Sequence, residues 1–473
     1  MMKIKNNYDV VILGSGPSGC ACAIRSAQLG LKVLCIDNLL NERSKKLLPG
    51  IFFNAGCLAT MALLESAKFY DSLLYDIHSH GIYVDNISLN VPRLIERKDN
   101  ILKTINHNIS QQFSEYKIHF IHAKAIVLNP QTVEIIYPVS SKSNQINAQH
   151  IVLATESSPI SVPCATVDNE FIFDSVAALN LNEVPKRLAI LGAGVIGLEL
   201  AGIWNRLGAE TILLDAQETF LGLTDHQISR EAYKIFTEQG LELQLGTRVI
   251  STKITNKKVL VEYEDPDGAH AIRVDKLIVA SGRKPNSDNL AALEANLLLN
   301  ENGYVHVNDN YRTSLPNVYA IGDLTLHGPM LAHKGIAEGQ FVAEKIAGLQ
   351  TSPIDYSLIP NVIYTEPEIA WVGHTEQAIK ALGDAIKIGI YSLNVNPKAI
   401  LGNKSTGMVK IISCAKTDTI LGVHIIATNA SELIAEASLA MEFSANCEDI
   451  TKTIHPYPSF VESIREACNA VKN

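Results

Sequence analysis

The sequence predicts an α/β fold, because two distant segments repeat the same order of apolar strand, glycine-rich turn and helix. The turns are Gly14-Ser-Gly16-Pro-Ser-Gly19 and Gly192-Ala-Gly194-Val-Ile-Gly197. An aspartate, Asp37 or Asp215, follows the first glycine of each turn at the same spacing. Such glycines let the backbone approach a diphosphate at a helix N-terminus, and the acid binds a ribose diol. Two unrelated tight turns would not explain this repetition, so the chain is predicted to hold two dinucleotide sites.

Length and composition limit the number of domains and the class of partner. A chain of 473 residues is too long for one core, so about three domains are expected. The chain is 47% hydrophobic and 19% charged, which is typical of a globular protein. A net charge of −9 argues against nucleic acid as a main partner.

The expected location is the cytoplasm, with no insertion into a membrane. No apolar run reaches the roughly 18 residues that a membrane helix needs. The first strand begins too close to residue 1 to leave room for a signal peptide. The eight cysteines lack the spacing of a disulfide framework or a metal site, so we expect reduced thiols and no bound metal.

The order of elements predicts three domains. Residues 1–151 and 277–349 form a first nucleotide-binding domain around a parallel sheet, which we expect to resume at the buried strand near residue 277. Residues 152–276 form a second, inserted nucleotide-binding domain of similar build. Residues 350–473 alternate strand-rich and helical segments and are predicted to form an α+β domain. Helices are expected at 57–75, 91–116 and 225–240, and a hairpin turn at 265–268.

Several longer sequence blocks resemble one protein family, both in their residues and in their order along the chain. They are GAGVIGLELAGIWNRLGAE (192–210), VASGRKPN (279–286), LPNVYAIGD (315–323), GPMLAHK (328–334), NVIYTEPEIAWVG (361–373) and CEDI (447–450). With the two glycine turns, they resemble the FAD-dependent pyridine nucleotide-disulfide oxidoreductases, and most closely the dihydrolipoyl dehydrogenase group. The resemblance covers nearly the whole chain. It implies two Rossmann-like domains that bind FAD and NAD, with a C-terminal dimerisation domain and a homodimer.

The resemblance assigns cofactor contacts residue by residue. Asp37 and the first glycine turn would hold the ADP half of FAD, Asp323 would bind the ribityl chain, and Met330, Leu331, Ala332 and His333 would lie against the flavin ring. Ala123, Ala154, Thr155 and Gly282 are assigned to the cofactor sites in the same way. Gly192, Gly194, Gly197 and Asp215 would bind NAD, with Glu199 near the nicotinamide. Residues 216–219, which directly follow Asp215, include no basic residue, and this favours NAD over NADP.

The redox centre departs from the family pattern and is predicted to be degenerate. The family segment GGTCLNVGCxPSK corresponds here to residues 49–61. The cysteine that exchanges with the substrate is replaced by Phe52, while the cysteine that contacts the flavin persists as Cys57. The lysine that follows it is replaced by Met61. Phenylalanine cannot form a disulfide, so electron transfer to a substrate disulfide is expected to be impaired.

The C-terminal signature HxHPxxxE departs from the family pattern at its catalytic base. It reads His455-Pro-Tyr457-Pro458-Ser-Phe-Val-Glu462. The base is replaced by Tyr457, whereas the acid that orients it persists as Glu462. Tyrosine, with an ordinary pKa near 10, is a poor base at neutral pH. Alternation along an extended segment directs His455 elsewhere, and the Tyr457-Pro458 bond is expected to be cis if the family turn is kept.

Cys57 has three interpretations. A thiol at a helix N-terminus favours the thiolate, so it could donate charge to the flavin or cycle through a sulfenic acid, as in single-cysteine NADH oxidases and peroxidases. It could instead be a packed relic, or pair with a distant cysteine. A further departure is Glu156, which follows Ala154-Thr155 where the family has glycine, and which we expect to weaken or reshape flavin binding.

The sequence therefore predicts a dihydrolipoyl dehydrogenase-like, FAD-dependent NAD(H) oxidoreductase with impaired disulfide chemistry and doubtful lipoamide activity. The alternatives are a single-cysteine NADH oxidase or peroxidase and a catalytically silent nucleotide-binding scaffold or sensor. NADH or NAD is the expected substrate, and the sequence does not identify the electron acceptor. Attachment to a 2-oxo acid dehydrogenase complex rests on analogy alone.

Overall fold

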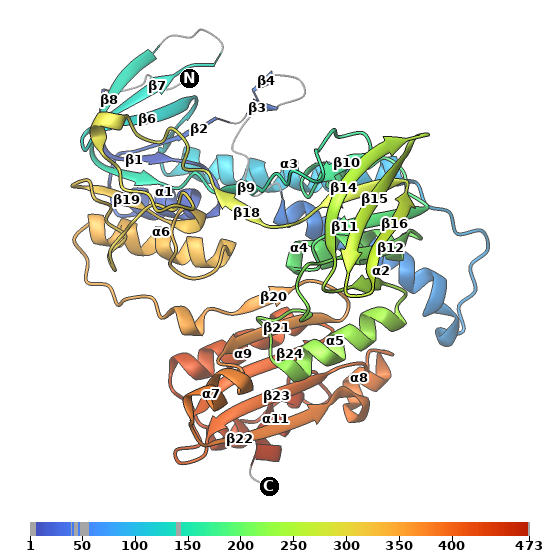
Figure 1. Cartoon of the computed structure of the whole chain (residues 1–473). Helices are drawn as coiled ribbons and strands as arrows, with labels where there is room; N and C mark the ends of the chain where they lie inside the picture. Colours follow the sequence, from blue (N-terminus) through green and yellow to red (C-terminus); the bar gives the residue numbers. More distant parts are fainter. Residues whose placement is uncertain (1–5, 39, 42–45, 48–55, 139–142, 472–473) are drawn as a thin grey trace. The chain divides into compact units, whose positions relative to one another are not determined.

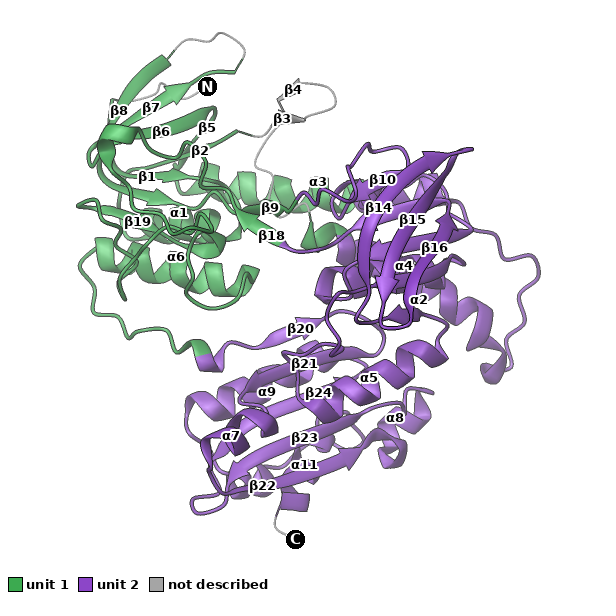
Figure 2. Ribbon diagram, in the orientation of Figure 1, with its two compact units in different colours: residues 1–59, 99–160, 283–356 green, residues 60–98, 161–282, 357–473 purple. Residues whose placement is uncertain are grey.

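A computed structural model describes residues 6–38, 40–41, 46–47, 56–138 and 143–471 of the chain (Figure 1). The chain divides into two compact units, coloured green and purple in Figure 2. Unit 1 comprises residues 1–59, 99–160 and 283–356, and unit 2 comprises residues 60–98, 161–282 and 357–473. Both units combine sheets with helices, which confirms the predicted α/β class.

A mostly parallel sheet lies at the centre of unit 1. Its strands run in the order β5-β2-β1-β8-β7-β6, with β19 beside β8. They are β1 (Asn7–Leu13), β2 (Val33–Asp37), β5 (His119–His122), β6 (Lys124–Asn129), β7 (Thr132–Ile136), β8 (Ser143–Leu153) and β19 (Val318–Ala320). Strand β1 pairs in parallel with both β2 and β8. A parallel strand in this central position is covered on both faces, which explains the unbroken apolar run of β1.

Helices α1 (Pro17–Gln28) and α6 (Ala332–Ile346) pack closely against each other in unit 1. A Cβ atom on Gly339 would lie 2.4 Å from the carbonyl oxygen of Ser18. Only glycine permits this approach of the two backbones. The packing brings the start of α1 and the segment before α6 together, and both belong to the first predicted nucleotide site. Unit 1 also contains β3 (Leu40–Asn41) and β4 (Lys46–Leu47), whereas α2 (Cys57–Tyr75) belongs mostly to unit 2 and α3 (Val91–Glu115) is divided between the units.

A second parallel sheet lies in unit 2, with the strand order β10-β17-β11-β12-β13. Its strands are β10 (Ile172–Asp174), β11 (Arg187–Leu191), β12 (Glu210–Leu214), β13 (Glu242–Gln244) and β17 (Lys276–Val279). An antiparallel sheet adds β14 (Arg248–Thr255), β15 (Lys258–Asp265) and β16 (Gly268–Val274), with the predicted hairpin turn between the last two. Helix α4 (Val195–Arg206) follows β11, and α5 (His226–Glu238) begins after Asp225, whose side chain accepts a hydrogen bond from the Gln227 N–H.

The strand near residue 277 corrects one expectation about domain organisation. We expected it to resume the first sheet. Instead β17 pairs with β10 and β11 in the second sheet, and β19 is the late strand that pairs with β8. Buried parallel strands are alike in composition, so their sequence does not state which sheet they join. The assignment of the three regions as FAD-binding, NAD-binding and dimerisation domains otherwise stays a prediction.

The C-terminal part of unit 2 is an antiparallel sheet with helices, as expected for an α+β region. The strand order is β20-β21-β24-β23-β22. Its strands and helices are β20 (Asn361–Ile363), β21 (Glu368–Gly373), α7 (Glu376–Leu382), β22 (Ile386–Ser392), α8 (Pro397–Leu401), β23 (Met408–Cys414), β24 (Ile420–Ala427), α9 (Ala430–Glu442), α10 (Cys447–Lys452) and α11 (Glu462–Val471). Helices α9 and α11 bury apolar residues against this sheet, including Leu433, Ile434 and Ile464.

Among the helices that the structure describes, none is both long and apolar enough to cross a membrane.

Candidate functional site

The first glycine turn connects β1 to α1 in unit 1. Gly14 has φ +111°, and a Cβ atom there would lie 2.0 Å from the carbonyl oxygen of Ala154. Likewise, a Cβ atom on Gly19 would lie 2.1 Å from the carbonyl oxygen of Gly14. Both positions therefore require glycine. Gly16 is the N-cap of α1, and Pro17 occupies the first helical position, which suits its fixed φ.

Asp37 lies at the end of β2, beside the first glycine turn. Its Oδ2 accepts hydrogen bonds from the backbone N–H and the hydroxyl of Ser15, at 2.6 and 2.7 Å. The backbone N–H of Ala123 donates to the Asp37 carbonyl oxygen at 3.0 Å. The sequence spacing therefore places the acid where a ribose bound next to the turn would meet it.

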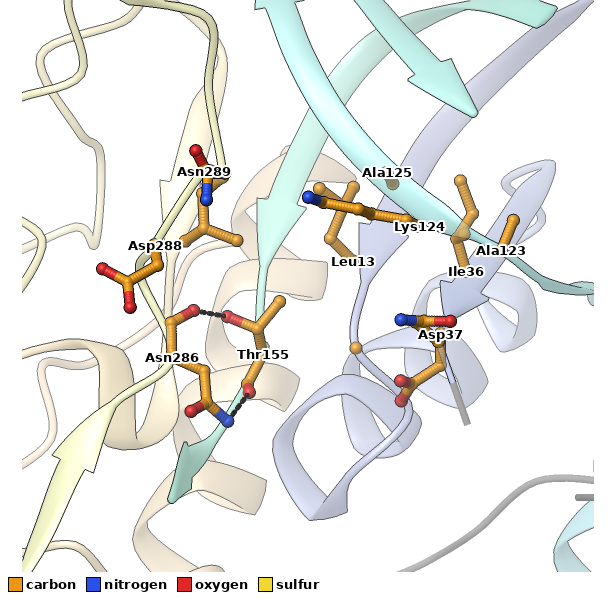
Figure 3. Close-up of a pocket in the computed structure, with 13 residues that line it drawn as sticks. Leu13, Ile36, Asp37, Ala123, Lys124, Ala125, Thr155, Asn286, Asp288 and Asn289 are labelled. Carbon is orange, nitrogen blue, oxygen red and sulfur yellow. Dashed lines mark hydrogen bonds between the residues drawn. The ribbon is translucent and has the colours of Figure 1, made fainter. Parts of the chain in front are cut away.

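A cavity of about 290 Å³ opens beside Asp37 (Figure 3). Its lining joins the ends of several strands of unit 1 and includes Leu13, Gly14, Ile36, Asp37, Asn38, Ala123, Lys124, Ala125, Thr155, Asn286, Asp288, Asn289 and Leu290. Thr155 donates from Oγ1 to the carbonyl oxygen of Asn286 at 2.7 Å, and the Asn286 amide donates to the carbonyl oxygen of Thr155 at 2.9 Å. Figure 3 shows this pair facing Asp37 and Ile36. The volume suits a nucleoside rather than a whole dinucleotide.

Asp323 lies just after β19, in the 3-10 turn Gly322–Leu324. One of its carboxylate oxygens accepts a hydrogen bond from the hydroxyl of Ser157, in β9 (Ser157–Pro159). Arg283, in β18 (Arg283–Pro285), donates to the Ser157 hydroxyl at 2.7 Å and to its carbonyl oxygen at 2.5 Å. Ser157 thus links Asp323 to Arg283.

A buried ion pair holds the turn that carries Asp323. Nζ of Lys334 lies 3.4 Å from Oε1 of Glu338 and donates to the carbonyl oxygen of Gly322 at 3.0 Å. Oε2 of Glu338 accepts from the Gly322 N–H at 2.6 Å, and Tyr356 donates its hydroxyl to Oε1 at 2.7 Å. Both charged side chains are fully buried, and burial raises the pKa of Glu338 while Lys334 opposes the rise. The pair therefore fixes the position of Asp323.

The residues expected against the flavin ring lie between this turn and α6. Leu331 is the N-cap of α6, and Ala332 is its first residue. Met330 and Leu331 are half-buried, whereas His333 is exposed. Their contact with a flavin stays a prediction.

Glu156 has an unexpected position at the first site. Its backbone is left-handed, with φ +62°, and its side chain fills the space over Gly16. A Cβ atom on Gly16 would lie 1.5 Å from Oε1 of Glu156. Burial, followed by the charges of Asp37 and Asp323, raises the pKa of Glu156 to about 7, and Arg283 opposes the rise.

The second glycine turn repeats the geometry of the first in unit 2. Gly192 has φ +106°, and a Cβ atom there would lie 2.6 Å from the carbonyl oxygen of Ala280. A Cβ atom on Gly197 would lie 2.0 Å from the carbonyl oxygen of Gly192. Gly194 differs from its counterpart Gly16, because no atom among the described residues lies within 4 Å of the position of its Cβ. The N-terminus of α4 is therefore open to an anion.

Asp215, directly after β12, is oriented by the second turn. Its Oδ2 accepts from the Ala193 N–H at 2.7 Å and its Oδ1 from the Gln217 N–H at 2.8 Å. Glu199 lies on α4 and is 8% exposed. Its Oε1 accepts from the Tyr364 N–H at 3.0 Å, and burial raises its pKa to about 7. Gly282, exposed with φ +120°, follows β17.

The C-terminal signature has a solvent-exposed tyrosine at the position of the family's base. Tyr457 is 75% exposed, and its bond to Pro458 is cis, as expected. Glu462 is buried at the start of α11, and its Oε2 accepts from the Ser459 N–H at 3.1 Å. His455 is buried, with Nδ1 2.9 Å from the carbonyl oxygen of Thr453 and Nε2 2.8 Å from Oε1 of Glu436. Both ring nitrogens of His455 are therefore engaged by neighbouring oxygens, which hold the ring in place.

Cys57 is the first residue of α2 and is exposed. Phe52, in the segment that should carry the partner sulfur, lies outside the described residues, and Met61 is half-buried on α2. The structure forms no disulfide among the eight cysteines, so the predicted alternative of a bond from Cys57 to a distant cysteine is not seen. Within the described part of the chain, no group of three His, Cys, Asp or Glu side chains is arranged to hold a metal ion.

Comparison with protein-family models decides the family. Residues 8–339 match the model described as pyridine nucleotide-disulphide oxidoreductase, and residues 359–468 match its dimerisation domain. The chain belongs to this family. The dimerisation-domain match supports a homodimer.

Relatives of known name are similar over the whole length of the chain. The dihydrolipoyl dehydrogenase of Cupriavidus necator is 40% identical over 471 residues, covering 99% of this chain and 98% of that protein. The mitochondrial dihydrolipoyl dehydrogenase of Caenorhabditis elegans is 38% identical, covering 97% of this chain and 91% of that protein. The crystal structure of LpdA from Mycobacterium tuberculosis superimposes with a TM-score of 0.88 at 25% identity, covering 98% and 99% of the two chains. The chain is thus a dihydrolipoyl dehydrogenase-like flavoprotein oxidoreductase of this family, which uses FAD and NAD(H).

The two cofactor sites fit their groups differently. The second site fits a dinucleotide as it stands, because Gly194 faces open space and Asp215 is oriented. At the first site, the cavity and Asp37 suit an adenosine, whereas the position of the diphosphate is filled by the Glu156 side chain. That side chain is flexible, so the site fits FAD once Glu156 turns away from Gly16.

Sequence reasoning missed several residues that shape these sites. Lys334 and Glu338 were not assigned roles, although their spacing of four residues on a helix allows a pair. Ser15 and Arg283 lie inside sequence blocks that carry the resemblance but had no role assigned, and Ser157 lies outside those blocks; their hydrogen bonds show their roles. Asp37 and Asp323 belong to unit 1, whereas Asp215, Glu199 and Tyr457 belong to unit 2.

Proposed function

We propose that this chain is an FAD-dependent oxidoreductase that takes hydride from NADH but does not turn over dihydrolipoamide. The observation that carries the proposal is that Phe52 stands in the place of the cysteine that exchanges with the substrate, so the second sulfur of the family's redox disulfide is missing from the sequence. A substrate disulfide cannot accept electrons without a mixed disulfide, and that step needs the missing sulfur. Tyr457 in place of the base weakens the same half-reaction.

The residues of the second site support the nucleotide half-reaction. The open N-terminus of α4 would receive the diphosphate of NADH, and Asp215 would accept from its ribose hydroxyls. The negative charge of Asp215 would repel a 2′-phosphate, which favours NAD over NADP. Glu199, buried one turn after the glycines, would orient the nicotinamide. FAD, when bound, would serve as the hydride acceptor.

Stopped-flow reduction under nitrogen tests the proposal. FAD-loaded protein should bleach on mixing with NADH, and the reduced protein should be reoxidised by oxygen, a quinone or an artificial dye but not by lipoamide. The proposal would be abandoned if lipoamide reoxidised the protein as fast as it reoxidises an ordinary dihydrolipoyl dehydrogenase measured beside it.

A second candidate is a peroxidase that uses Cys57 as its redox sulfur. The exposure of this thiol at the start of α2 favours it. The thiolate would attack hydrogen peroxide, and the O–O bond would break to give a sulfenic acid and hydroxide. A hydride equivalent from NADH would then return the sulfur to the thiolate, with the sulfenic oxygen leaving as water. Peroxide-dependent consumption of NADH should then disappear in Cys57→Ser, and unchanged consumption would rule this candidate out.

A third candidate, a nucleotide-binding scaffold or sensor without catalysis, is favoured by the Glu156 side chain over Gly16. The visible spectrum separates it from the enzymes, since a scaffold would stay colourless after incubation with FAD. Attachment to a 2-oxo acid dehydrogenase complex and a cytoplasmic location stay predictions.

A further inference from the structure

The two glycine turns allow a direct comparison within one chain. Gly16 and Gly194 are each the N-cap of the helix that follows, with nearly equal backbone angles of φ −73° and −77°. A Cβ atom on Gly16 would lie 1.5, 2.3 and 2.8 Å from Oε1, Cδ and Cγ of Glu156, whereas no described atom comes within 4 Å at Gly194. The second glycine of this turn is the one that lets the backbone approach a diphosphate. The Glu156 carboxylate thus occupies the position that the second site keeps open.

The local structure explains why the carboxylate lies there. The left-handed backbone of Glu156 is anchored by the Asn286 N–H, which donates to its carbonyl oxygen at 2.9 Å. From this position the side chain reaches the N-terminus of α1, where unpaired N–H groups and the helix dipole attract a negative charge. No side-chain hydrogen bond or ion pair holds the carboxylate among the residues that the structure describes, so it is free to leave.

We propose that Glu156 is an internal anion that competes with the diphosphate of FAD for the N-terminus of α1, so that protonation or withdrawal of its side chain opens the first site. This inference rests on the proposed function, because it names what controls the loading of the same flavin site. The adenosine cavity beside Asp37 is separate from the blocked position and stays accessible.

The charges around Glu156 set the direction of the pH dependence. Asp37 at the end of β2 and Asp323 after β19 disfavour its ionised form, whereas Arg283 on β18 favours it. The Cys20 thiol on α1 also faces this group, but burial and the acids raise its pKa, so it stays neutral and adds no charge. A diphosphate would add negative charge to this group and raise the pKa of Glu156 above its value of about 7 in the free protein. Binding of FAD therefore takes up a proton, and its affinity falls as the pH rises through 7.

Binding titrations of flavin-free protein test the inference without turnover. FAD fluorescence quenching is measured at pH 6 and pH 8 for the wild type, Glu156→Gly, Glu156→Gln and the control Glu301→Gln, which changes an exposed glutamate elsewhere in unit 1. The wild type and the control should bind about tenfold more weakly at pH 8 than at pH 6. Both Glu156 variants should bind at least about tenfold more tightly than the wild type at pH 8 and lose the pH dependence.

Two further ligands identify where the effect arises. Adenosine, which lacks the diphosphate, should bind all four proteins equally, and NADH at the second site should report that each variant is folded. Equal and tight binding of FAD by all four proteins at both pH values would overturn only the role of Glu156. Failure of every variant to bind FAD, while NADH still binds, would overturn both this inference and the proposed function. A parallel change in adenosine affinity would also overturn the inference, because the effect would then not lie at the diphosphate.

Discussion

The carboxylate of Glu199 accepts a hydrogen bond from the backbone N–H of Tyr364, 3.0 Å away. Glu199 belongs to the helix that follows the second glycine turn, and Tyr364 directly follows β20. The bond therefore joins the predicted nicotinamide site to the C-terminal sheet of the same unit. It opposes the effect of burial on the pKa of Glu199, which still reaches about 7.

Replacement of Glu199 by glutamine should change how stability depends on pH. An unfolded glutamate has a pKa near 4.5, so between pH 4.5 and about 7 the folded wild type binds more protons than the unfolded chain and loses stability as the pH rises. Glutamine does not titrate, so the Glu199→Gln variant does not lose stability in this way. The unfolding free energy of the variant minus that of the wild type should therefore rise by about 3 kcal/mol between pH 4.5 and pH 8.

Urea denaturation at a series of pH values measures this difference. Glu238→Gln, at an exposed position on α5, is the matched control and should follow the wild type at every pH. A Glu199→Gln curve parallel to that of the control would contradict the shifted pKa.

Replacement of Asp215 by alanine should weaken NADH binding by about ten- to a hundredfold, since hydrogen bonds to a charged group contribute roughly 1.5–3 kcal/mol. NADPH binding should weaken less or improve, because the repulsion of its 2′-phosphate is removed. Calorimetric titration with NADH and with NADPH measures the ratio of the two affinities in the variant and in the wild type. Asp37→Ala, the equivalent change at the first turn, should leave NADH affinity unchanged, and an equal loss in both variants would show that Asp215 does not contact the ribose.

Restoration of the family pattern should restore lipoamide activity only when both lost groups return. Phe52→Cys supplies the exchanging sulfur and Tyr457→His supplies the base, so the double variant should reduce lipoamide at a rate well above that of the wild type. Each single variant should remain near the wild-type level, because each lacks one part of the same half-reaction. Thiol titration before and after reduction should detect a new disulfide to Cys57 in the variants with Phe52→Cys. Activity in Tyr457→His alone would show that a second sulfur is not needed.

Removal of Lys334 should destabilise unit 1 strongly. Lys334→Met leaves the buried carboxylate of Glu338 without its cation, which typically costs about 3–5 kcal/mol. The double variant Lys334→Met, Glu338→Gln should recover part of this loss. Lys284→Met is the surface control, since this lysine is largely exposed and lies 3.8 Å from Asp288, and it should cost at most about 1 kcal/mol. Chemical denaturation of the wild type and the three variants measures these losses of unfolding free energy. Equal losses in Lys334→Met and Lys284→Met would contradict the role of the buried pair.

Local patterns predicted much of the fold. The two glycine turns, their aspartates and the helix from Cys57 to Tyr75 lie where the spacing of glycine and apolar residues indicated. The cis bond before Pro458 was also anticipated from its motif. These features depend on residues that are close in sequence, so the information is contained in short segments.

The sequence did not predict features that depend on contacts between residues far apart in the chain. The sequence of β17 is compatible with either parallel sheet, because a strand buried on both faces carries no mark of its neighbours. Lys334 and Glu338 carry no sign of burial in the sequence, because the groups that contact them, Gly322 and Tyr356, lie elsewhere in the chain. Glu156 was recognised as a departure from the family, but only the folded turn shows that its carboxylate lies over Gly16, 140 residues earlier in the chain.

The hydrogen bonds from Ser15 to Asp37 and from Ala193 to Asp215 have a thermodynamic consequence for ligand recognition. Each acid is already restricted to one rotamer before any nucleotide arrives, so the loss of side-chain entropy occurs during folding rather than during association. The ribose end of each ligand therefore meets a rigid acceptor, and differences in affinity between the two sites arise where the phosphates bind.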